Sequence, residues 1–303
     1  MLFRSKRLYT LGDKSDLICF DALTGEALWR RNLETEYGVE QFCFNASPLM
    51  EGRLLILCIG SYGGGSPSCV LALDKDSGKE VWRTPTEGLT NSSPIAITAG
   101  GKRQVIVWTQ KSVMSLDPMT GKTYWEERTN TMAQNAVATP VSDKDLLLVS
   151  GLMLKLDADK PAASVLWPET KASSRRVLSN TSTPIILGDH VFSAKLSGGF
   201  VCLEASTGRE VWQTDKVTER RNGTSAHMTP HGDAVFIFTD TGDLIRARLT
   251  SDGCQEISRI HLIEPTCPYA GRKVVWPPPA YANRHVFVRN DKELICVSLA
   301  AQP

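Results

Sequence analysis

The feature that most constrains this chain is a ten-residue unit that recurs along it. Residues 203–212 read Leu-Glu-Ala-Ser-Thr-Gly-Arg-Glu-Val-Trp, and residues 20–29, 73–82 and 116–125 follow the same pattern. The pattern is an apolar residue, an acidic residue, two variable residues, Thr or Ser, Gly, three variable residues and Trp. The positions that define the repeat are Asp21, Gly25, Trp29, Asp74, Gly78, Trp82, Asp117, Gly121, Trp125, Gly208 and Trp212.

Each copy of this unit predicts a β-hairpin. Asp and Thr favour turns because their side chains accept hydrogen bonds from nearby backbone N–H groups. Gly supplies the positive φ that a tight turn needs. An apolar run precedes the acidic residue and an alternating run leads to the Trp, so two strands should meet at the turn. The large Trp suits a half-buried seam between neighbouring repeats.

A second marker, Ser/Thr-Pro, sets the period of the repeat. The prolines are Pro48, Pro94, Pro140, Pro184, Pro230 and, in a weaker Pro-Pro form, Pro279. They follow one another at intervals of 44 to 49 residues, and each interval holds four strand signals. Such a period with all-β content predicts a β-propeller built from four-stranded antiparallel blades.

About seven blade units can be placed, in one propeller domain spanning residues 1–303. They lie at about 7–31, 47–83, 93–127, 139–167, 183–213, 229–259 and 279–299. The first unit is expected to lack its first strand and the last its fourth, so we expect an N-terminally truncated propeller. Two units are degenerate: 139–167 keeps Trp167 but has no Thr-Gly turn, and 229–259 has Ile257 where Trp is expected. Ile257 can fill part of the seam.

The composition is that of an ordinary soluble globular protein. The 303 residues carry a net charge of +1, which argues against nucleic acid as a partner. No apolar run approaches the roughly 20 residues of a membrane span, and no signal peptide is recognised. We expect a monomer. Cys19, Cys202 and Cys296 share one repeat position that favours a small buried residue, whereas Cys254 and Cys267 could either pair or stay free.

The two markers in register resemble the pyrroloquinoline-quinone-like (PQQ-like) β-propeller repeat proteins of the quinoprotein-alcohol-dehydrogenase-like superfamily. The resemblance covers residues 7–299. It implies a propeller that is usually eight-bladed and usually exported in bacteria, hence a periplasmic or otherwise extracytoplasmic location.

The resemblance leaves three functions open. One branch of the superfamily consists of non-catalytic binding or assembly scaffolds, and this is the function we predict, with no cofactor. The alternative is a quinoprotein-type oxidoreductase that binds PQQ with calcium in the central channel. Such enzymes carry an adjacent Cys-Cys pair, which this sequence lacks. The third possible function is that of a WD-repeat-like interaction propeller inside the cell. The Thr-Gly-x-x-x-Trp pattern argues against it, because WD repeats end their third strand in Trp-Asp.

The candidate binding face follows from the parity of an antiparallel meander. The uniform Asp-x-x-Thr-Gly turns should lie on one face and the variable loops 31–46, 60–69, 168–182, 214–228 and 259–278 on the other. Basic residues gather in three of these loops, at Arg175, Arg176, Arg220, Arg221, Arg272 and Lys273. They predict a site for an unknown protein or an anionic ligand, unless they are simply solvated.

The sequence offers no catalytic or metal-binding arrangement. No Ser-His-Asp or Gly-x-Ser-x-Gly pattern stands out. His227 and His231 flank one Thr-Pro marker without Asp or Cys at metal-ligand spacing, so we interpret both as structural.

Overall fold

The computed structural model describes residues 2–4, 6–12, 15–39, 46–60, 68–129, 137–168, 178–179 and 181–300. Chain contacts divide the protein into two compact units, residues 1–175 and 176–303. Within each unit the strands form antiparallel sheets whose members follow one another in chain order. The predicted all-β propeller with seven blade sheets is confirmed.

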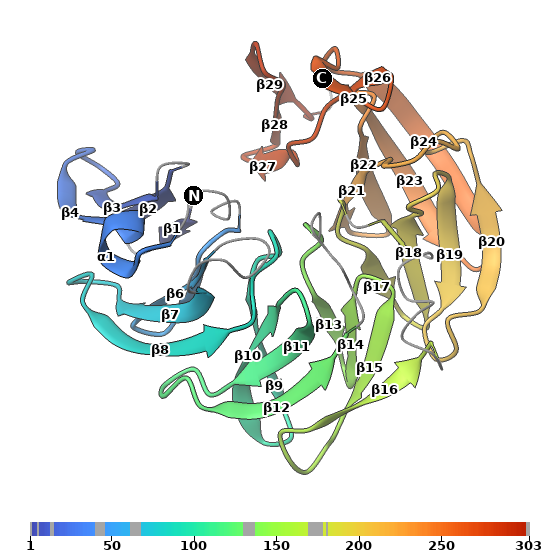
Figure 1. Cartoon of the computed structure of the whole chain (residues 1–303). Coiled ribbons are helices and arrows are strands. Elements are labelled where there is room, and N and C mark those ends of the chain that lie inside the picture. The colour runs from blue at the N-terminus through green and yellow to red at the C-terminus, as the bar shows by residue number, and fades with distance from the viewer. Residues whose placement is uncertain are drawn as a thin grey trace. The chain divides into compact units, whose positions relative to one another are not determined.

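The first unit contains four four-stranded blades (Figure 1). Their strands are β1 (Leu2–Arg4), β2 (Arg7–Leu11), β3 (Asp16–Asp21) and β4 (Ala27–Asn32); β5 (Leu49–Glu51), β6 (Leu54–Ile59), β7 (Ser68–Asp74) and β8 (Glu80–Thr86); β9 (Ile95–Ala99), β10 (Lys102–Trp108), β11 (Ser112–Leu116) and β12 (Thr123–Arg128); and β13 (Val141–Asp143), β14 (Leu146–Val149), β15 (Leu152–Leu156) and β16 (Ala163–Trp167).

The second unit contains two four-stranded blades, a hairpin and a three-stranded blade. Its strands are β17 (Ile185–Leu187), β18 (His190–Ala194), β19 (Phe200–Glu204) and β20 (Glu210–Thr214); β21 (Ala226–His231), β22 (Ala234–Thr239), β23 (Asp243–Thr250) and β24 (Gly253–His261); β25 (Cys267–Tyr269) and β26 (Arg272–Val274); and β27 (Ala280–Ala282), β28 (His285–Arg289) and β29 (Leu294–Ser298).

Three elements differ from the sequence prediction. Strand β1 supplies the first strand that we expected the first blade to lack. A short helix, α1 (Leu33–Tyr37), lies in a predicted loop, where the side chain of Asn32 caps the backbone N–H of Thr35 and Gly38 ends the helix in the left-handed conformation. The hairpin β25–β26 forms within the predicted loop 259–278.

The hydrophobic core lies between successive sheets of each unit. One cluster joins Ile56 and Val70 of the second blade to Val105 and Leu116 of the third. Another, in the second unit, joins the sheet of β17–β20 to that of β21–β24. The contacting strands are the second and third of each blade, so these carry the almost continuous apolar runs.

The repeat turns have the predicted geometry. Asp21 Oδ1 accepts hydrogen bonds from the backbone N–H groups of Leu23 and Thr24, at 2.9 and 3.0 Å. The Gly25 N–H closes the turn on the Asp21 carbonyl at 2.9 Å, with φ of 73° at Gly25. The same bonds recur around Asp74 and Asp117. The acidic residue and the Gly therefore fix the hairpin locally.

The repeat Trp of three blades, at Trp29, Trp82 and Trp212, donates a hydrogen bond to the following blade. Trp125 Nε1 instead donates to Gln104 Oε1 within its own blade, at 3.0 Å. Trp29 Nε1 donates to the Lys75 carbonyl at 3.1 Å, and Trp82 Nε1 donates to the Pro118 carbonyl at 2.9 Å. In both cases the acceptor belongs to the turn of the following blade. A Cβ added to Gly121 would lie 2.4 Å from the Trp82 ring, so Gly is needed there for space as well as for its φ of +71°.

The two degenerate blades differ from the regular ones at the position of the repeat Trp. Trp167 pairs with Met153, four positions before Asp157, whereas Trp29 pairs with Cys19, two positions before Asp21. The position two before Asp157 is Lys155, which pairs with Ser164. In the blade β21–β24 the residue in the Trp place is Ser258, which pairs with Arg246. Ile257 lies at the bulge and is 38% exposed, so the expectation that it fills the seam is wrong.

Candidate functional site

Each unit has two distinct faces, as the meander parity predicted. In the second unit the β18–β19 turn lies against the β20–β21 loop, because Gly199 N–H donates to the Glu219 carbonyl at 3.0 Å. We call this side of a unit the loop face. On the opposite side, the turn face, the repeat turns lie beside the turns between first and second strands. Ala205 N–H, for example, donates to the Asp189 carbonyl at 2.8 Å.

Four of the six predicted basic residues lie on neighbouring loops of the second unit. Arg175 and Arg176 lie outside the described residues. A Cβ at Gly198 would come within 2.1 Å of the Arg221 backbone nitrogen, so the β20–β21 loop packs on the β18–β19 turn. Arg272 Nη2 donates to the Gly223 carbonyl at 3.4 Å, so the β25–β26 hairpin packs on the same loop. The basic loop cluster defined here is Lys216, Arg220, Arg221, Arg272 and Lys273.

The basic residues of this cluster differ in whether their charge is free to bind a partner. Arg220 and Arg221 form exposed ion pairs with Asp215 and Glu219 at 3.8 and 2.8 Å. Such exposed pairs are weak and exchange readily with solvent or a partner. The side chains of Lys216 and Lys273 are exposed and form no ion pair within the described part of the chain.

Arg272 differs because its charge is used inside the protein. Its guanidinium lies 2.5 Å from Asp240, whose side chain is only 2% exposed. Burial raises the pKa of Asp240, and the neighbouring Arg272 opposes that rise. Removing one partner of such a buried pair leaves the other charge unpaired, which is strongly destabilising. Arg272 therefore holds the β25–β26 hairpin in place, and its charge is not available on the surface.

Aromatic side chains accompany the cluster, and sequence reasoning missed them as site residues. Tyr269 is 38% exposed and meets Trp276 edge to face, with ring centroids 4.9 Å apart. A Cβ at Gly223 would lie 2.4 Å from the Tyr269 ring, so this Gly lets the loop approach the ring. The carbonyl of Trp276 lies 3.1 Å from His227 Nε2, and burial lowers the pKa of His227 to about 4. His227 is thus neutral and structural, as predicted.

His, Cys, Asp and Glu are the side chains that could hold a metal ion in the described part of the chain. No three His, Cys, Asp or Glu side chains there approach closely enough to hold a metal ion. Cys254 and Cys267 are free thiols. Among the same residues, no helix has the length and apolar character needed to cross a membrane.

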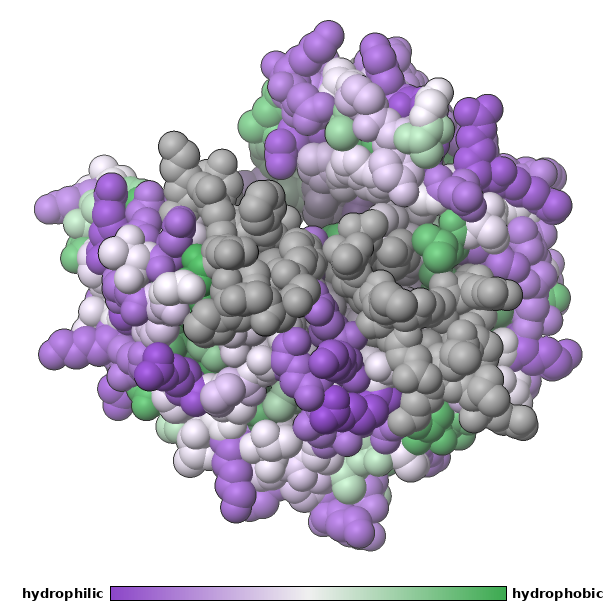
Figure 2. Space-filling view, viewed as in Figure 1, coloured by the Kyte–Doolittle hydropathy of each residue, from purple (hydrophilic) through white to green (hydrophobic). Residues whose placement is uncertain are grey.

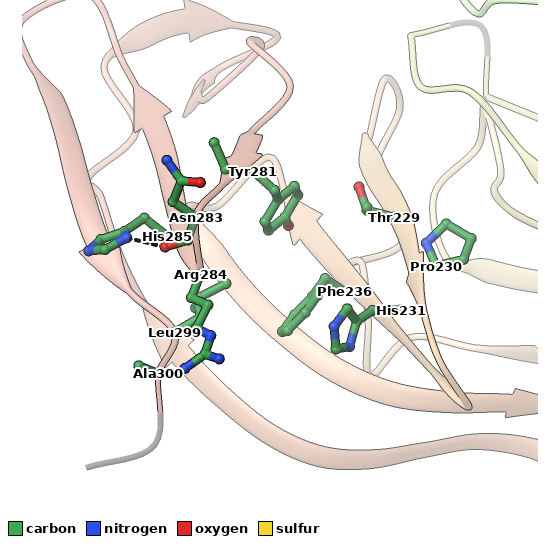
Figure 3. Close-up of a pocket in the computed structure, with 11 residues that line it drawn as sticks. Thr229, Pro230, His231, Phe236, Tyr281, Asn283, Arg284, His285, Leu299 and Ala300 are labelled. Atoms are coloured by element: carbon green, nitrogen blue, oxygen red, sulfur yellow. Dashed lines mark hydrogen bonds between the residues drawn. The ribbon is translucent and has the colours of Figure 1, made fainter. Parts of the chain in front are cut away.

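A pocket of about 550 Å³ lies on the turn face of the second unit, between the blades β21–β24 and β27–β29 (Figure 3). Phe236 and Tyr281 line it and stack on each other, with ring centroids 5.6 Å apart. His231, interpreted from sequence as structural, lines this pocket beside Phe236.

The face seen in Figure 2 is mainly hydrophilic where its residues are described. In the view of Figure 2, hydrophilic residues cover most of the described surface and hydrophobic ones form small separate groups. A partner that binds this face must therefore satisfy polar and charged groups rather than cover one large apolar patch.

Sequence comparisons point to one family. A sequence model of the PQQ_2 family, described as outer membrane protein assembly factor BamB, matches residues 13–253. The chain is 25% identical over 217 residues to an outer membrane protein assembly factor BamB of Burkholderia pseudomallei (strain K96243), covering 68% of this chain and 52% of that protein. A protein of the same name from Shewanella oneidensis is 21% identical over 232 residues, covering 73% and 56%. The chain thus spans about half the length of these two relatives.

Solved structures agree on the fold. BamB from Moraxella catarrhalis superposes with a TM-score of 0.66 and 19% identity, covering 96% of this chain and 80% of that one. Quinohemoprotein alcohol dehydrogenase from Comamonas testosteroni gives a TM-score of 0.64 at 12% identity, covering 93% and 61%. At these identities the superpositions show a common fold and no more. The match over residues 13–253 goes further: the chain belongs to the PQQ_2 family of outer membrane protein assembly factor BamB.

Proposed function

We propose that this chain is a non-catalytic binding propeller that holds a protein partner on the loop face of its second unit. The observation that carries the proposal is the basic loop cluster around the exposed ring of Tyr269. Tyr and Arg are the residue types that most often dominate protein interfaces, because they combine apolar area with directional hydrogen bonds. Lys216 and Lys273 add positive charge that would steer an acidic surface toward the aromatic centre.

The family supports the biological setting of this proposal. The relatives from Burkholderia pseudomallei and Shewanella oneidensis are both named for outer membrane protein assembly. We extend that role to this chain and propose that it works outside the cytoplasm, as part of the assembly of outer membrane proteins. The proposed role is binding alone and uses neither PQQ nor calcium.

The experiment places a photo-crosslinking amino acid at Tyr269, in cells that make the full chain. We expect light to join it to one discrete envelope protein with an acidic docking surface. A matched probe at Leu23, which is 80% exposed on the turn face of the first unit, should give no such product.

Charge reversal then tests the cluster itself. The combined change Lys216→Glu, Arg220→Glu and Lys273→Glu should lower the crosslinking yield at least about tenfold, because like charges then face each other. The control is Arg209→Glu, on the turn face of the same unit, which should leave the yield unchanged. Equal yields from Tyr269 and Leu23, or equal losses from both sets of changes, would overturn the proposal.

A further inference from the structure

Two complete blades contain the same row of three side chains across strands two, three and four. In the first blade the row is Tyr9, Cys19 and Trp29, which pair directly with one another. In the blade β17–β20 it is Phe192, Cys202 and Trp212. In both rows the indole lies against the strand-two ring, with centroids 5.9 Å apart. The small Cys between them leaves room for this contact.

The blade β21–β24 contains only the first member of that row. Phe236 pairs with Arg246, and Arg246 pairs with Ser258. Ser258 is exposed and stands in the place of the Trp. No indole of this blade therefore covers Phe236, and the pocket of about 550 Å³ opens beside that ring. The pocket thus lies beside the ring against which the first blade and the blade β17–β20 each pack an indole.

The walls of the pocket offer an aromatic surface. Phe236 and Tyr281 stack with an interplanar angle of 25°, and the His231 ring lies 5.6 Å from Phe236 (Figure 3). Planar rings bind such surfaces in offset or edge-to-face contacts. The volume lies within the range of small-molecule sites, so the space is large enough for an indole and a polar substituent.

The polar groups of the pocket favour a negative charge. Arg284 comes from the β27–β28 turn, and its carbonyl is held by the Leu299 N–H at 2.7 Å. The Arg284 guanidinium forms no ion pair with any described residue, and no Asp or Glu lines the pocket. An unpaired guanidinium beside an aromatic surface is a strong donor for a carboxylate.

The Tyr281 hydroxyl is a further polar group in the wall of the pocket. This hydroxyl is buried, and although Thr229 lies close to it, the two form no hydrogen bond of normal geometry. Burial raises the pKa of Tyr281 to about 12, so the phenol stays protonated at neutral pH. A buried hydroxyl without a good partner costs free energy, which a bound acceptor would recover.

We propose that this pocket binds an indole-sized aromatic ring that carries a carboxylate. The ring lies against Phe236 and Tyr281, in the place that Trp212 takes in the preceding blade, and the carboxylate pairs with Arg284. The ligand is either a free aromatic acid or an aromatic residue at the carboxyl end of a peptide. This site lies on the turn face and is independent of the basic loop cluster.

The test uses the full chain and fluorine NMR of N-acetyl-5-fluorotryptophan. We expect saturable line broadening for the acid and roughly tenfold weaker binding for its neutral amide, because the amide lacks the charge-assisted bond to Arg284. The change Arg284→Gln should weaken binding of the acid to the level of the amide. Arg289→Gln, an exposed arginine of the same hairpin outside the pocket, is the matched control.

A second variant fills the pocket from within. Arg246→Cys together with Ser258→Trp recreates the row Phe192, Cys202 and Trp212 in this blade. We expect the double variant to lose probe binding and to unfold at a higher temperature than the natural chain. Unchanged probe binding in this folded variant would overturn the proposal, as would equal binding of acid and amide.

The source of the ligand is decided by a third comparison. A short peptide that ends in tryptophan with a free carboxyl group should bind at least as well as the free acid if the natural ligand is a peptide. Weaker binding of the peptide would assign the pocket to a free aromatic acid. If neither bound at millimolar concentration, the proposal would be wrong.

Discussion

Two seams between neighbouring blades are packed differently. One lies between the second and third blades, and the other lies between the last two blades of the second unit. In the former, Trp82 is 8% exposed and donates to the Pro118 carbonyl of the following turn. In the latter, Ser258 takes the Trp place and a pocket remains beside Phe236. Stability in the first seam comes from burying an indole, whereas the second keeps an aromatic wall accessible to a ligand.

The comparison shows that the Trp and the Gly of the next blade act as one pair. Gly78 and Gly121 would each bring an added Cβ to 3.0 Å or less from the preceding Trp ring. Gly25 opens the repeat series, and an added Cβ there would meet nothing within 4 Å. The three glycines share one turn conformation but differ in their surroundings. Substitutions can therefore separate backbone strain from seam packing.

The largest effect on stability should come from removing the Trp that fills a seam between two blades. Trp82→Ala removes a nearly buried indole and leaves the Pro118 carbonyl without its donor. We expect a loss of about 3–5 kcal/mol in the free energy of unfolding, from the lost burial and the cavity together. Urea unfolding followed by circular dichroism measures it. Ser258→Ala, in the open seam, is the control and should change stability by less than about 0.5 kcal/mol.

A smaller effect should distinguish Gly121 from Gly25. Both have φ near +70°, so an Ala side chain costs about 1 kcal/mol of strain at either position. At Gly121 the new methyl also collides with Trp82, which should add about 1–3 kcal/mol. In the Trp82→Ala background this extra cost should disappear. Equal effects of Gly121→Ala and Gly25→Ala would show that the seam does not need the glycine for space.

The smallest effect on stability should come from the negative charge of Asp74, in the repeat turn of the second blade. Hydrogen bonds from Arg53 and Ser77 lower the pKa of Asp74 to about 2. Because the folded pKa is below the unfolded value of about 3.9, the carboxylate stabilises the protein above pH ~4, and this contribution is lost as the pH falls toward 2. Arg53 is largely exposed, so we expect less than about 1 kcal/mol.

Unfolding of the natural chain and Asp74→Asn across this pH range measures the contribution. The two curves should converge as the pH falls, and Arg53→Gln should lie between them. Parallel curves would show that the carboxylate does not contribute through its charge.

Much of the fold could be predicted because the repeat turn is local. Asp21 bonds to residues two and three positions ahead, so its role can be inferred from a few letters of sequence. The seam role of Trp could also be predicted, because the repeat recurs at a regular interval. Strand β1 was missed because no Ser/Thr-Pro marker precedes it, and α1 was missed because five residues carry no helical period.

The candidate site was less predictable because its contacts join distant residues. Arg272 was assigned to a basic surface, yet Asp240, 32 positions earlier in the chain, takes up its charge. The missing Trp of the blade β21–β24 was recognised, but the bulge shifts the equivalent residue from Ile257 to Ser258. The aromatic wall beside it could not be predicted, because Phe236 and Tyr281 are far apart in the sequence and stack only in the folded chain.

Trp29 and Trp82 each contact the blade that follows their own. This contact limits how the gene can gain or lose repeats. Each Trp lies in one blade and the Gly that it contacts lies in the next blade, so neither blade contains both residues of the contact. A duplication of one whole period still supplies an indole and a glycine in the right order at both new junctions. Duplication of part of a period would leave one of them unmatched. The contact thus favours duplication of whole repeat periods, because only these keep a Trp followed by its Gly at every junction between blades.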